Sequence, residues 1–337
     1  MAVLPLLTDS SLFARSLQYP YNYTPTEYVT IIFLVLFSVS LALHTGQAIY
    51  FRMWWAIPTM IFSGLLEVMG WSARFWSSQS PSLLSPYEMQ LTCTILAPTP
   101  LLAGNFIILG SIIQQLGPKY SRISPWWYTI IFCSFDMISL LVQAVGGGMA
   151  ATAVGKLQDP TPGGHIMLGG IAFQMATITV YILCALEFFF RYLGDKPLKR
   201  TQNSSSESKG QCFLDHDIFE KKSSVSDSLP TLCDAQDHGD ADRRGSMNTK
   251  LRIMTIALAL STVLIFIRAI YRTIELTDGW SGRIISTQLY FNVLDGGMIV
   301  AAIYTMNIAH PGLLLDASVS LGEFGDIFKQ ICARMRS

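Results

Sequence analysis

Seven runs of mainly apolar residues, most of them about 20 residues long, constrain this chain more than any other feature. An α-helix needs about 20 apolar residues to cross the hydrocarbon core of a bilayer, because each residue adds about 1.5 Å. Only 14% of the 337 residues are charged, whereas a soluble domain carries about 25%. The sequence therefore predicts an all-α, polytopic membrane protein with seven transmembrane helices. We expect them at residues 28–43, 55–75, 89–113, 126–150, 168–190, 252–275 and 286–308.

The basic residues between these runs gather on one side of the predicted bundle. The opposite side has only Arg15, Lys156 and Arg283 clear of the runs. Lys and Arg concentrate in cytosolic loops, so we expect the N-terminus outside and the C-terminus in the cytosol. Seven crossings also require termini on opposite sides. The basic residues of the side assigned to the cytosol include Arg52, Lys119, Arg122, Arg191, Lys196, Lys199, Arg200, Arg243, Arg244, Lys250, Lys329, Arg334 and Arg336.

The predicted topology divides the chain into five parts. They are an outer or lumenal N-terminal segment (1–27), helices one to five (28–194), a cytosolic loop (195–250), helices six and seven (251–310) and a cytosolic tail (311–337). The loop is rich in Ser, Asp, Lys and Gly, so we expect it to be disordered.

Two features lie in the terminal segments. Asn22 begins an Asn-Tyr-Thr sequon, which is an N-glycosylation acceptor if this segment is lumenal. The apolar residues of the tail follow a helical spacing that favours a short helix in the membrane interface, and they are Phe324, Ile327, Phe328, Ile331 and Met335. We expect a multi-pass protein of the plasma membrane.

Several classes of function have no motif in this sequence. Basic domains and zinc-finger spacings are absent, so nucleic acid is not an expected partner. None of the six cysteines lies in a CxxC or Cys/His cluster, so neither a metal, nor another cofactor, nor a structural disulfide is expected. The phosphate-loop motif of ATP-driven pumps is missing, as are the HExxH and GxSxG motifs of hydrolases. We therefore do not expect an enzyme, and the sequence indicates no protein partner.

Charged residues inside the apolar runs mark the predicted functional site. Such a residue costs about 2.5–3.5 kcal/mol at the bilayer centre on insertion scales, so a chain retains it where it pairs or lines a polar cavity. Arg268, Arg272 and Glu275 are spaced i, i+4, i+7 and share one helix face. We expect four acids and three bases to pair across the second, fourth, sixth and seventh helices. The acids are Glu67, Asp136, Glu275 and Asp295, and the bases are Arg74, Arg268 and Arg272.

Proline and neutral polar residues add to this picture. Pro98 and Pro100 remove backbone N–H donors from the third helix, which predicts a kink and free carbonyl groups. Asn105 and Gln143 either line a cavity or make interhelical hydrogen bonds. Glu187 and Arg191, four residues apart near a helix end, are typical of a surface ion pair.

Two interpretations of the charged residues stay open. A paired cluster can serve only to hold helices in register. Alternatively, the charges line a polar cavity that opens outward and receives a charged or zwitterionic head, while the apolar remainder of the ligand stays against lipid.

The same residues carry a resemblance to a known family. With them the chain resembles the fungal RTA-like proteins, named for resistance to aminocholesterol and also called the lipid-translocating exporter family. Trp71 stands where the family pattern has tyrosine, and Gln288 stands where the seventh helix usually begins with glutamate. The matching stretches are Glu67-x-x-Gly70-x-x-x-Arg74, Ala97-Pro98, Phe135-Asp136-x-x-Ser139-x-x-x-Gln143-x-x-Gly146-Gly147-Gly148, Arg268-x-x-Tyr271-Arg272-x-x-Glu275, Asp295 and His310-Pro311-Gly312.

The resemblance implies a seven-helix fungal membrane protein that releases lipids or moves them across the bilayer. It implies sphingoid bases, phospholipids, sterol-like toxins or secondary metabolites as substrates. Two functions follow as hypotheses. One is a translocator or exporter of lipids or amphiphilic small molecules. Its site would be the charged cluster in the outer half of the membrane together with the neutral Gln143. The alternative is a seven-helix receptor or sensor for a lipid-like ligand.

Overall fold

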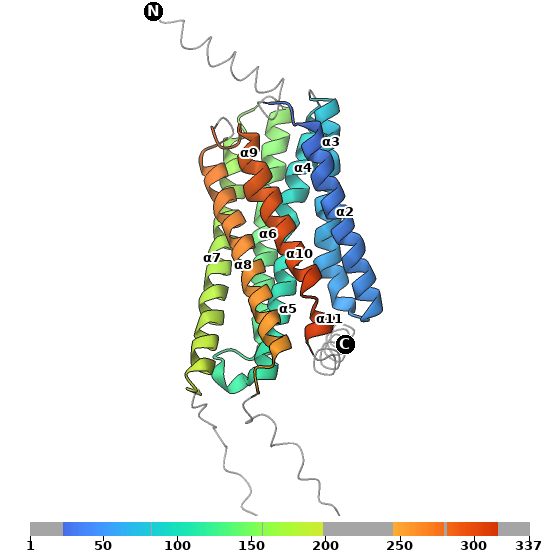
Figure 1. Cartoon of the computed structure of the whole chain (residues 1–337). Coiled ribbons are helices and arrows are strands. Elements are labelled where there is room, and N and C mark those ends of the chain that lie inside the picture. Colours follow the sequence, from blue (N-terminus) through green and yellow to red (C-terminus); the bar gives the residue numbers. More distant parts are fainter. Residues whose placement is uncertain (1–22, 82, 157, 198–244, 280–281, 316–337) are drawn as a thin grey trace, which may run out of the picture.

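The computed structural model describes residues 23–81, 83–156, 158–197, 245–279 and 282–315, and these residues form a bundle of long helices (Figure 1). The seven predicted membrane spans are confirmed. Their bounds are Glu27–Tyr50, Trp54–Gln79, Leu84–Leu116, Pro125–Ala153, Thr161–Leu193, Thr249–Thr277 and Gln288–Leu314. The first span runs to Tyr50 rather than residue 43, because polar residues at a span end stay helical once the helix has formed.

Three predictions lie outside the described residues. They are the sequon at Asn22, most of the 195–250 loop and the interfacial helix of the tail.

Several spans consist of more than one helical segment. The α-helices are α2 (Glu27–Tyr50), α3 (Phe62–Gln79), α4 (Leu84–Leu96), α5 (Pro98–Leu116), α6 (Pro125–Gly155), α7 (Thr161–Leu193), α8 (Thr249–Thr277), α9 (Gln288–Tyr290), α10 (Met298–Ile308) and α11 (Pro311–Leu314). Short 3₁₀ helices cover Trp54–Ala56 and Pro118–Tyr120. Two π-helical segments, Ile57–Ile61 and Phe291–Gly297, lie in the second and seventh spans.

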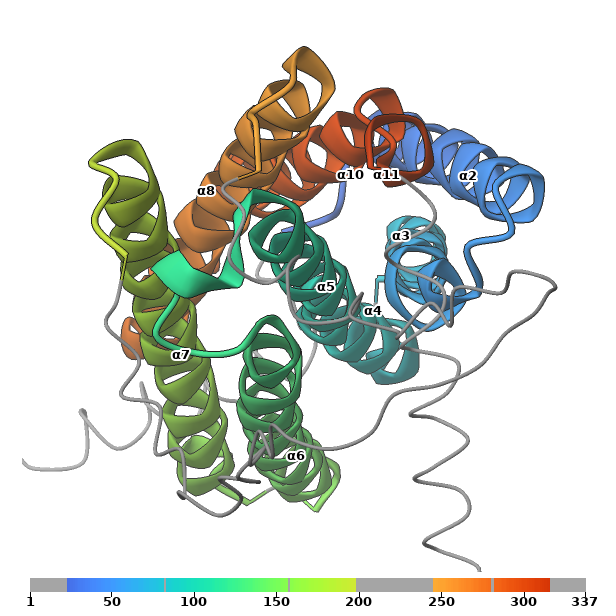
Figure 2. The same cartoon turned by 90° about the horizontal axis from the view of Figure 1, so that it is seen from below.

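Helix α5 occupies the middle of the bundle, with the other long helices around it (Figure 2). Its apolar residues are buried almost without exception, as Leu102, Phe106 and Ile112 illustrate. The peripheral helices instead expose large apolar side chains, such as Val35 on α2 and Leu183 on α7. Apolar residues on both the inner and the outer faces are what a lipid environment requires, since lipid chains replace water around the bundle.

Glycines bring α6 and α7 into close contact. A Cβ atom on Gly146 would lie 2.3 Å from the backbone N of Met167, and one on Gly163 would lie 2.4 Å from the backbone N of Ala150. No real side chain fits at such distances, so the backbones themselves form this interface. Small residues serve this purpose in membrane helix packing, where close van der Waals contact replaces the hydrophobic effect.

The predicted proline interruption of the third span is confirmed. Helix α4 ends at Leu96, and α5 begins at Pro98 after the single residue Ala97. Pro98 has no N–H group to offer to the carbonyl of Thr94, four residues earlier. The Thr94 carbonyl is therefore free to accept a hydrogen bond from another helix.

The π-helical segment Phe291–Gly297 contains Asp295, and the sequence did not predict it. A π-helix widens the turn by one residue and frequently occurs at functional sites. The widened turn is located where the acid of the seventh span faces α8.

Candidate functional site

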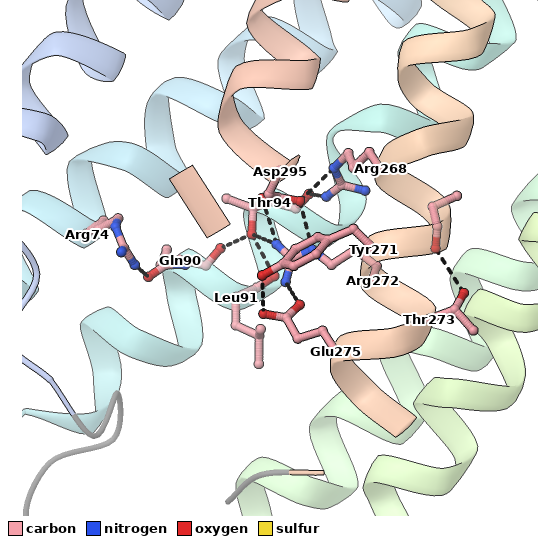
Figure 3. Close-up of polar contacts among 11 residues, drawn as sticks. Arg74, Gln90, Leu91, Thr94, Arg268, Tyr271, Arg272, Thr273, Glu275 and Asp295 are labelled. Carbon is pink, nitrogen blue, oxygen red and sulfur yellow. Dashed lines mark hydrogen bonds and ion pairs between the residues drawn. The ribbon is translucent and has the colours of Figure 1, made fainter. Parts of the chain in front are cut away.

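Four buried charged residues of α8 and the seventh span form one ion network (Figure 3). We use "ion network" for Arg268, Arg272, Glu275 and Asp295. Arg272 donates from Nε and Nη2 to the two carboxylate oxygens of Asp295, each at 2.8 Å, and from Nη1 to Glu275 Oε2 at 2.9 Å. Arg268 Nε lies 2.8 Å from Asp295 Oδ1. The formal charges cancel, and no side chain of the network is more than 7% exposed.

Thr94 joins the ion network to the proline interruption. The Thr94 carbonyl accepts a hydrogen bond from Arg268 Nη2, and Thr94 Oγ1 accepts one from Arg272 Nη2 at 3.1 Å (Figure 3). Because Pro98 leaves this carbonyl without its intrahelical donor, the guanidinium group of Arg268 takes the place of the missing N–H. The sequence predicted a free carbonyl here, and the structure identifies its donor.

Replacing Pro98 with alanine should therefore weaken the contact between Arg268 and Thr94. The new N–H would compete with Arg268 for the Thr94 carbonyl, so we expect the free energy of unfolding to rise by no more than about 1 kcal/mol. Thermal unfolding in detergent measures the effect. Pro100→Ala is the matched control and should stabilise more, because in the described residues no charged side chain bonds the Leu96 carbonyl that its new N–H would satisfy. Equal stabilisation by both variants would contradict the expectation.

Arg74 lies beside the ion network and contacts an aromatic ring that Arg272 also contacts. Its Nη1 donates to Gln90 Oε1 at 3.1 Å, and its Nη2 donates to Tyr23 OH at 3.0 Å. Its guanidinium carbon is 4.4 Å from the ring centroid of Phe291, and that of Arg272 is 5.2 Å from the same centroid. Cation–π attraction thus links Arg74 to the network through Phe291.

Two of the predicted acids do not pair as expected. Glu67 and Asp136 are buried, at 2% and 1% exposure, and neither makes an ion pair within the described residues. Asp136 Oδ1 accepts from Gln174 Nε2 at 3.0 Å, and Oδ2 has no partner there. The prediction of mutual pairing is therefore wrong for these two acids. For Asp136 the physical reason is that α5, α6 and α7 contain no Lys or Arg within the membrane.

A chain of neutral polar residues surrounds Asp136. Gln174 of α7 also donates to Thr99 Oγ1 at 3.0 Å and accepts from Gln143 Nε2 at 3.0 Å. Gln143 Nε2 further contacts Ser139 Oγ at 2.8 Å. Asn105 makes interhelical hydrogen bonds from Nδ2 to Ser261 and Thr262, at 3.3 Å each. Of the two alternatives for this residue, a cavity lining or an interhelical hydrogen bond, the second therefore holds.

A small cavity separates this chain from the ion network. Its polar lining consists of Gln143, Gln174, Arg268 and Arg272, and apolar residues of α4, α5, α7 and α8 complete it. Its volume of about 20 Å³ is enough for about one water molecule. A group much larger than one water molecule does not fit in this cavity.

Comparisons with known proteins agree with the resemblance in sequence. A family model described as "RTA1 like protein" matches residues 60–318. The chain belongs to the RTA1-like family. The comparison with solved structures gives no match.

Several relatives of this RTA1-like chain come from Saccharomyces cerevisiae. The sphingoid long-chain base transporter RSB1 is 27% identical over 297 residues, which cover 86% of this chain and 72% of the relative. Protein RTA1 is 26% identical over 316 residues, covering 86% of this chain and 84% of the relative. Protein RTM1 is 25% identical over 250 residues, covering 74% and 65%.

The two departures from the family pattern have clear structural settings. Trp71 is fully buried and stacks on Phe33 with ring centroids 4.2 Å apart. A Cβ atom on Gly296 would lie 2.5 Å from the Trp71 ring, so the larger aromatic fills the space beside the π-helical segment. Gln288 Oε1 accepts from Thr26 Oγ1 at 2.9 Å, a bond that a glutamate would accept equally.

Four contributors to this RTA1-like site were not predicted from the sequence, namely Thr94, Gln90, Phe291 and Gln174. All four are uncharged, and the prediction of the site rested on charged residues. A glutamine inside an apolar run is also costly to bury, and that signal applied to Gln174 as it did to Gln143. Glu187 and Arg191 are paired as predicted, at 2.7 Å, and Arg122 joins them.

Proposed function

We propose that this RTA1-like protein moves amphiphilic lipids across a membrane, with sphingoid long-chain bases as the first candidate class. The ion network carries the proposal. Two cations and two anions that cancel can exchange partners with a zwitterionic head and leave no buried charge uncompensated, whereas a cationic head adds one positive charge that a further carboxylate, such as that of Glu67 or Asp136, must balance. The name of one relative, the sphingoid long-chain base transporter RSB1, supports the same class of substrate.

In this proposal the head of the lipid enters the bundle, and its tail stays in the bilayer. An ammonium group would pair with Asp295 or Glu275, and a phosphate group with Arg268 or Arg272. The helices must separate for this, because the cavity holds about one water molecule. The interruption at Ala97 and the π-helical segment Phe291–Gly297 are the places where the spans can bend.

The driving force would be a gradient of the lipid or of protons. Glu67 and Asp136, buried without an ion-pair partner in the described part of the chain, are the acids that we assign to proton exchange. We propose no chemical conversion of the lipid.

We also propose an orientation with the N-terminus outside, in the plasma membrane. The distribution of basic residues supports this orientation. The C-terminal end of α8 and the start of the seventh span lie at the end of the bundle where α2 begins (Figure 1). The ion network, which these segments hold, is then in the outer half. Protease accessibility of a tag at the C-terminus in intact cells tests the orientation, and cleavage without cell lysis would contradict it.

Transbilayer movement of a fluorescent sphingoid base in liposomes tests the function. We expect the purified protein to accelerate movement, and Asp295→Asn to reduce the rate by about tenfold or more, or about 1.4 kcal/mol in barrier height. Asp136→Asn should reduce the dependence on a pH gradient, and Asp136→Asn combined with Glu67→Gln should abolish it. Glu187→Gln is the matched control, since it removes one carboxylate charge from an exposed pair far from the network.

A negative result in that assay has a defined meaning. If wild-type protein moves the lipid no faster than empty liposomes, with and without a pH gradient, the chain is not an autonomous translocator. A phospholipid analogue in the same assay shows whether a head that carries a phosphate is also moved, or only a head that carries an amine and no phosphate.

A further inference from the structure

A second group of polar residues lies between α2 and α10, away from the ion network. Ser40, His44 and Gln47 are spaced i, i+4, i+7 and share one face of α2. Opposite them are Asn307, near the end of α10, and His310, which caps the start of α11. We call these five residues the α2–α10 polar cluster. Asn307 Nδ2 donates to Ser40 Oγ at 2.6 Å, and Gln47 Nε2 donates to the Asn307 carbonyl at 2.9 Å.

Several atoms of this cluster are buried and have no hydrogen-bond partner among the residues that the structure describes. They are both ring nitrogens of His44, Oε1 of Gln47 and Oδ1 of Asn307. The carbonyl of Ile303 is the acceptor that faces the His44 ring, and a bond to it would use one ring nitrogen and leave the other without a partner. His44 is 1% exposed and Asn307 6%. Most buried polar groups in proteins are hydrogen-bonded. A polar network with unbonded members stabilises a fold less than an apolar contact would. A purely structural contact between α2 and α10 therefore does not account for these atoms.

The unbonded atoms define the chemistry of a ligand. The two amide oxygens accept hydrogen bonds only, and a neutral imidazole offers one acceptor and one donor. No member of the α2–α10 polar cluster is an acid or a base other than histidine. A protonated primary amine with adjacent hydroxyl groups supplies the donors that these acceptors lack, whereas a carboxylate or phosphate head supplies only acceptors.

We propose that Ser40, His44, Gln47 and Asn307 form a second headgroup site, selective for the amino-alcohol head of a long-chain base. The inference rests on the proposed function and names a loading site for it. In the proposed orientation the site lies on the cytosolic side.

The position of the site relative to the ion network supports this role. The ion network and the α2–α10 polar cluster both include residues of the seventh span. Asp295 and Asn307 are twelve positions apart, which corresponds to about 18 Å along a helix. Between them the interface is apolar, with Phe37, Ile299 and Ile303 buried at 0–1% exposure. The head would thus rest at either polar site, with an apolar barrier between the two. The other face of α2 exposes Val35, Val39 and Leu43, where the lipid tail can remain outside the bundle.

Photolabelling tests the site directly. The probe is a long-chain base with a diazirine beside its amino-diol head, bound to the full-length protein in liposomes and mapped by mass spectrometry. We expect adducts on the segments 40–47 and 303–310. His44→Leu with Asn307→Leu should reduce these adducts by about fivefold or more, as expected when two hydrogen bonds are lost. Adducts near Asp295 should remain.

Two controls accompany the labelling. Thr45→Val removes a hydroxyl from the same turn of α2 that bonds only the Leu41 carbonyl of its own helix, at 2.8 Å, so it should leave labelling unchanged. A fatty acid with the diazirine at the same place should not label the cluster.

The outcomes separate this proposal from the broader function. Adducts confined to the neighbourhood of Asp295, with lipid movement intact in liposomes, would overturn the second site and leave the translocator in place. No specific adducts and no lipid movement would overturn both. The wild-type map alone decides between these results, so the test does not depend on whether the double variant folds.

Discussion

Arg272→Gln is expected to destabilise the protein by about 3–5 kcal/mol and to abolish lipid movement. Within the described residues, Arg272 donates the two hydrogen bonds that Asp295 accepts from a basic side chain. It also donates the one hydrogen bond that Glu275 accepts from a basic side chain. Its loss leaves the buried carboxylate of Glu275 with the Tyr271 hydroxyl, at 2.8 Å, as its remaining donor. Unfolding of the purified protein in detergent, followed by tryptophan fluorescence, measures the change.

A double variant separates the structural role of the ion network from its functional one. Arg272→Gln combined with Glu275→Gln removes one cation and one anion, so the network stays neutral. We expect it to recover at least about half of the lost stability, because no uncompensated charge is left buried. Lipid movement should stay absent. Recovery of movement together with stability would mean that these charges only hold the helices in register.

Gly146→Ala is the second substitution with a large expected effect, about 3 kcal/mol of destabilisation. Its methyl group would meet backbone atoms of α7, Met167 N at 2.3 Å and the Gly163 carbonyl at 2.8 Å, and backbone cannot rotate away as a side chain can. The two helices would have to separate, which would also pull Gln143 from Gln174. The midpoint of thermal unfolding in detergent measures the loss.

The neighbouring glycines provide the controls for this prediction. A Cβ atom on Gly147 would meet only the sulfur of Met167, at 3.6 Å, and one on Gly148 would meet nothing within 4 Å. Gly148→Ala should be neutral or stabilising by up to about 1 kcal/mol, because alanine favours a helix over glycine. Equal effects at Gly146 and Gly148 would show that the close contact between α6 and α7 does not exist.

The sequence predicted the seven spans because a bilayer leaves a chain few choices. Every backbone group must be bonded within its own segment, and only long apolar helices allow this in single crossings. The ends of the spans were predicted less accurately, since residues such as Tyr50 and Trp54 suit either a helix end or the headgroup region. The π-helical segment around Asp295 left no pattern, because it depends on packing against α8.

The sequence predicted which residues form the site better than it predicted which residues each of them contacts. The cost of burial singled out Arg272 and Asp295, which do pair. It did not reveal that Asp136 meets Gln174 rather than a base, because the contact depends on how glycines let α6 and α7 approach. It also did not reveal why His44 and His310, both without an obvious partner in the sequence, face the same helix interface.

The exposed apolar face of α2 has a consequence for substrate choice. Val35, Val39 and Leu43 face the surroundings of the bundle, on the same helix as three of the residues proposed to hold the head. A tail lying along this face would be solvated by the bilayer throughout the crossing, and the protein would hold no measure of its length or saturation. Selection would then rest on the head alone, and amphiphiles with unrelated tails could share one route through the same protein.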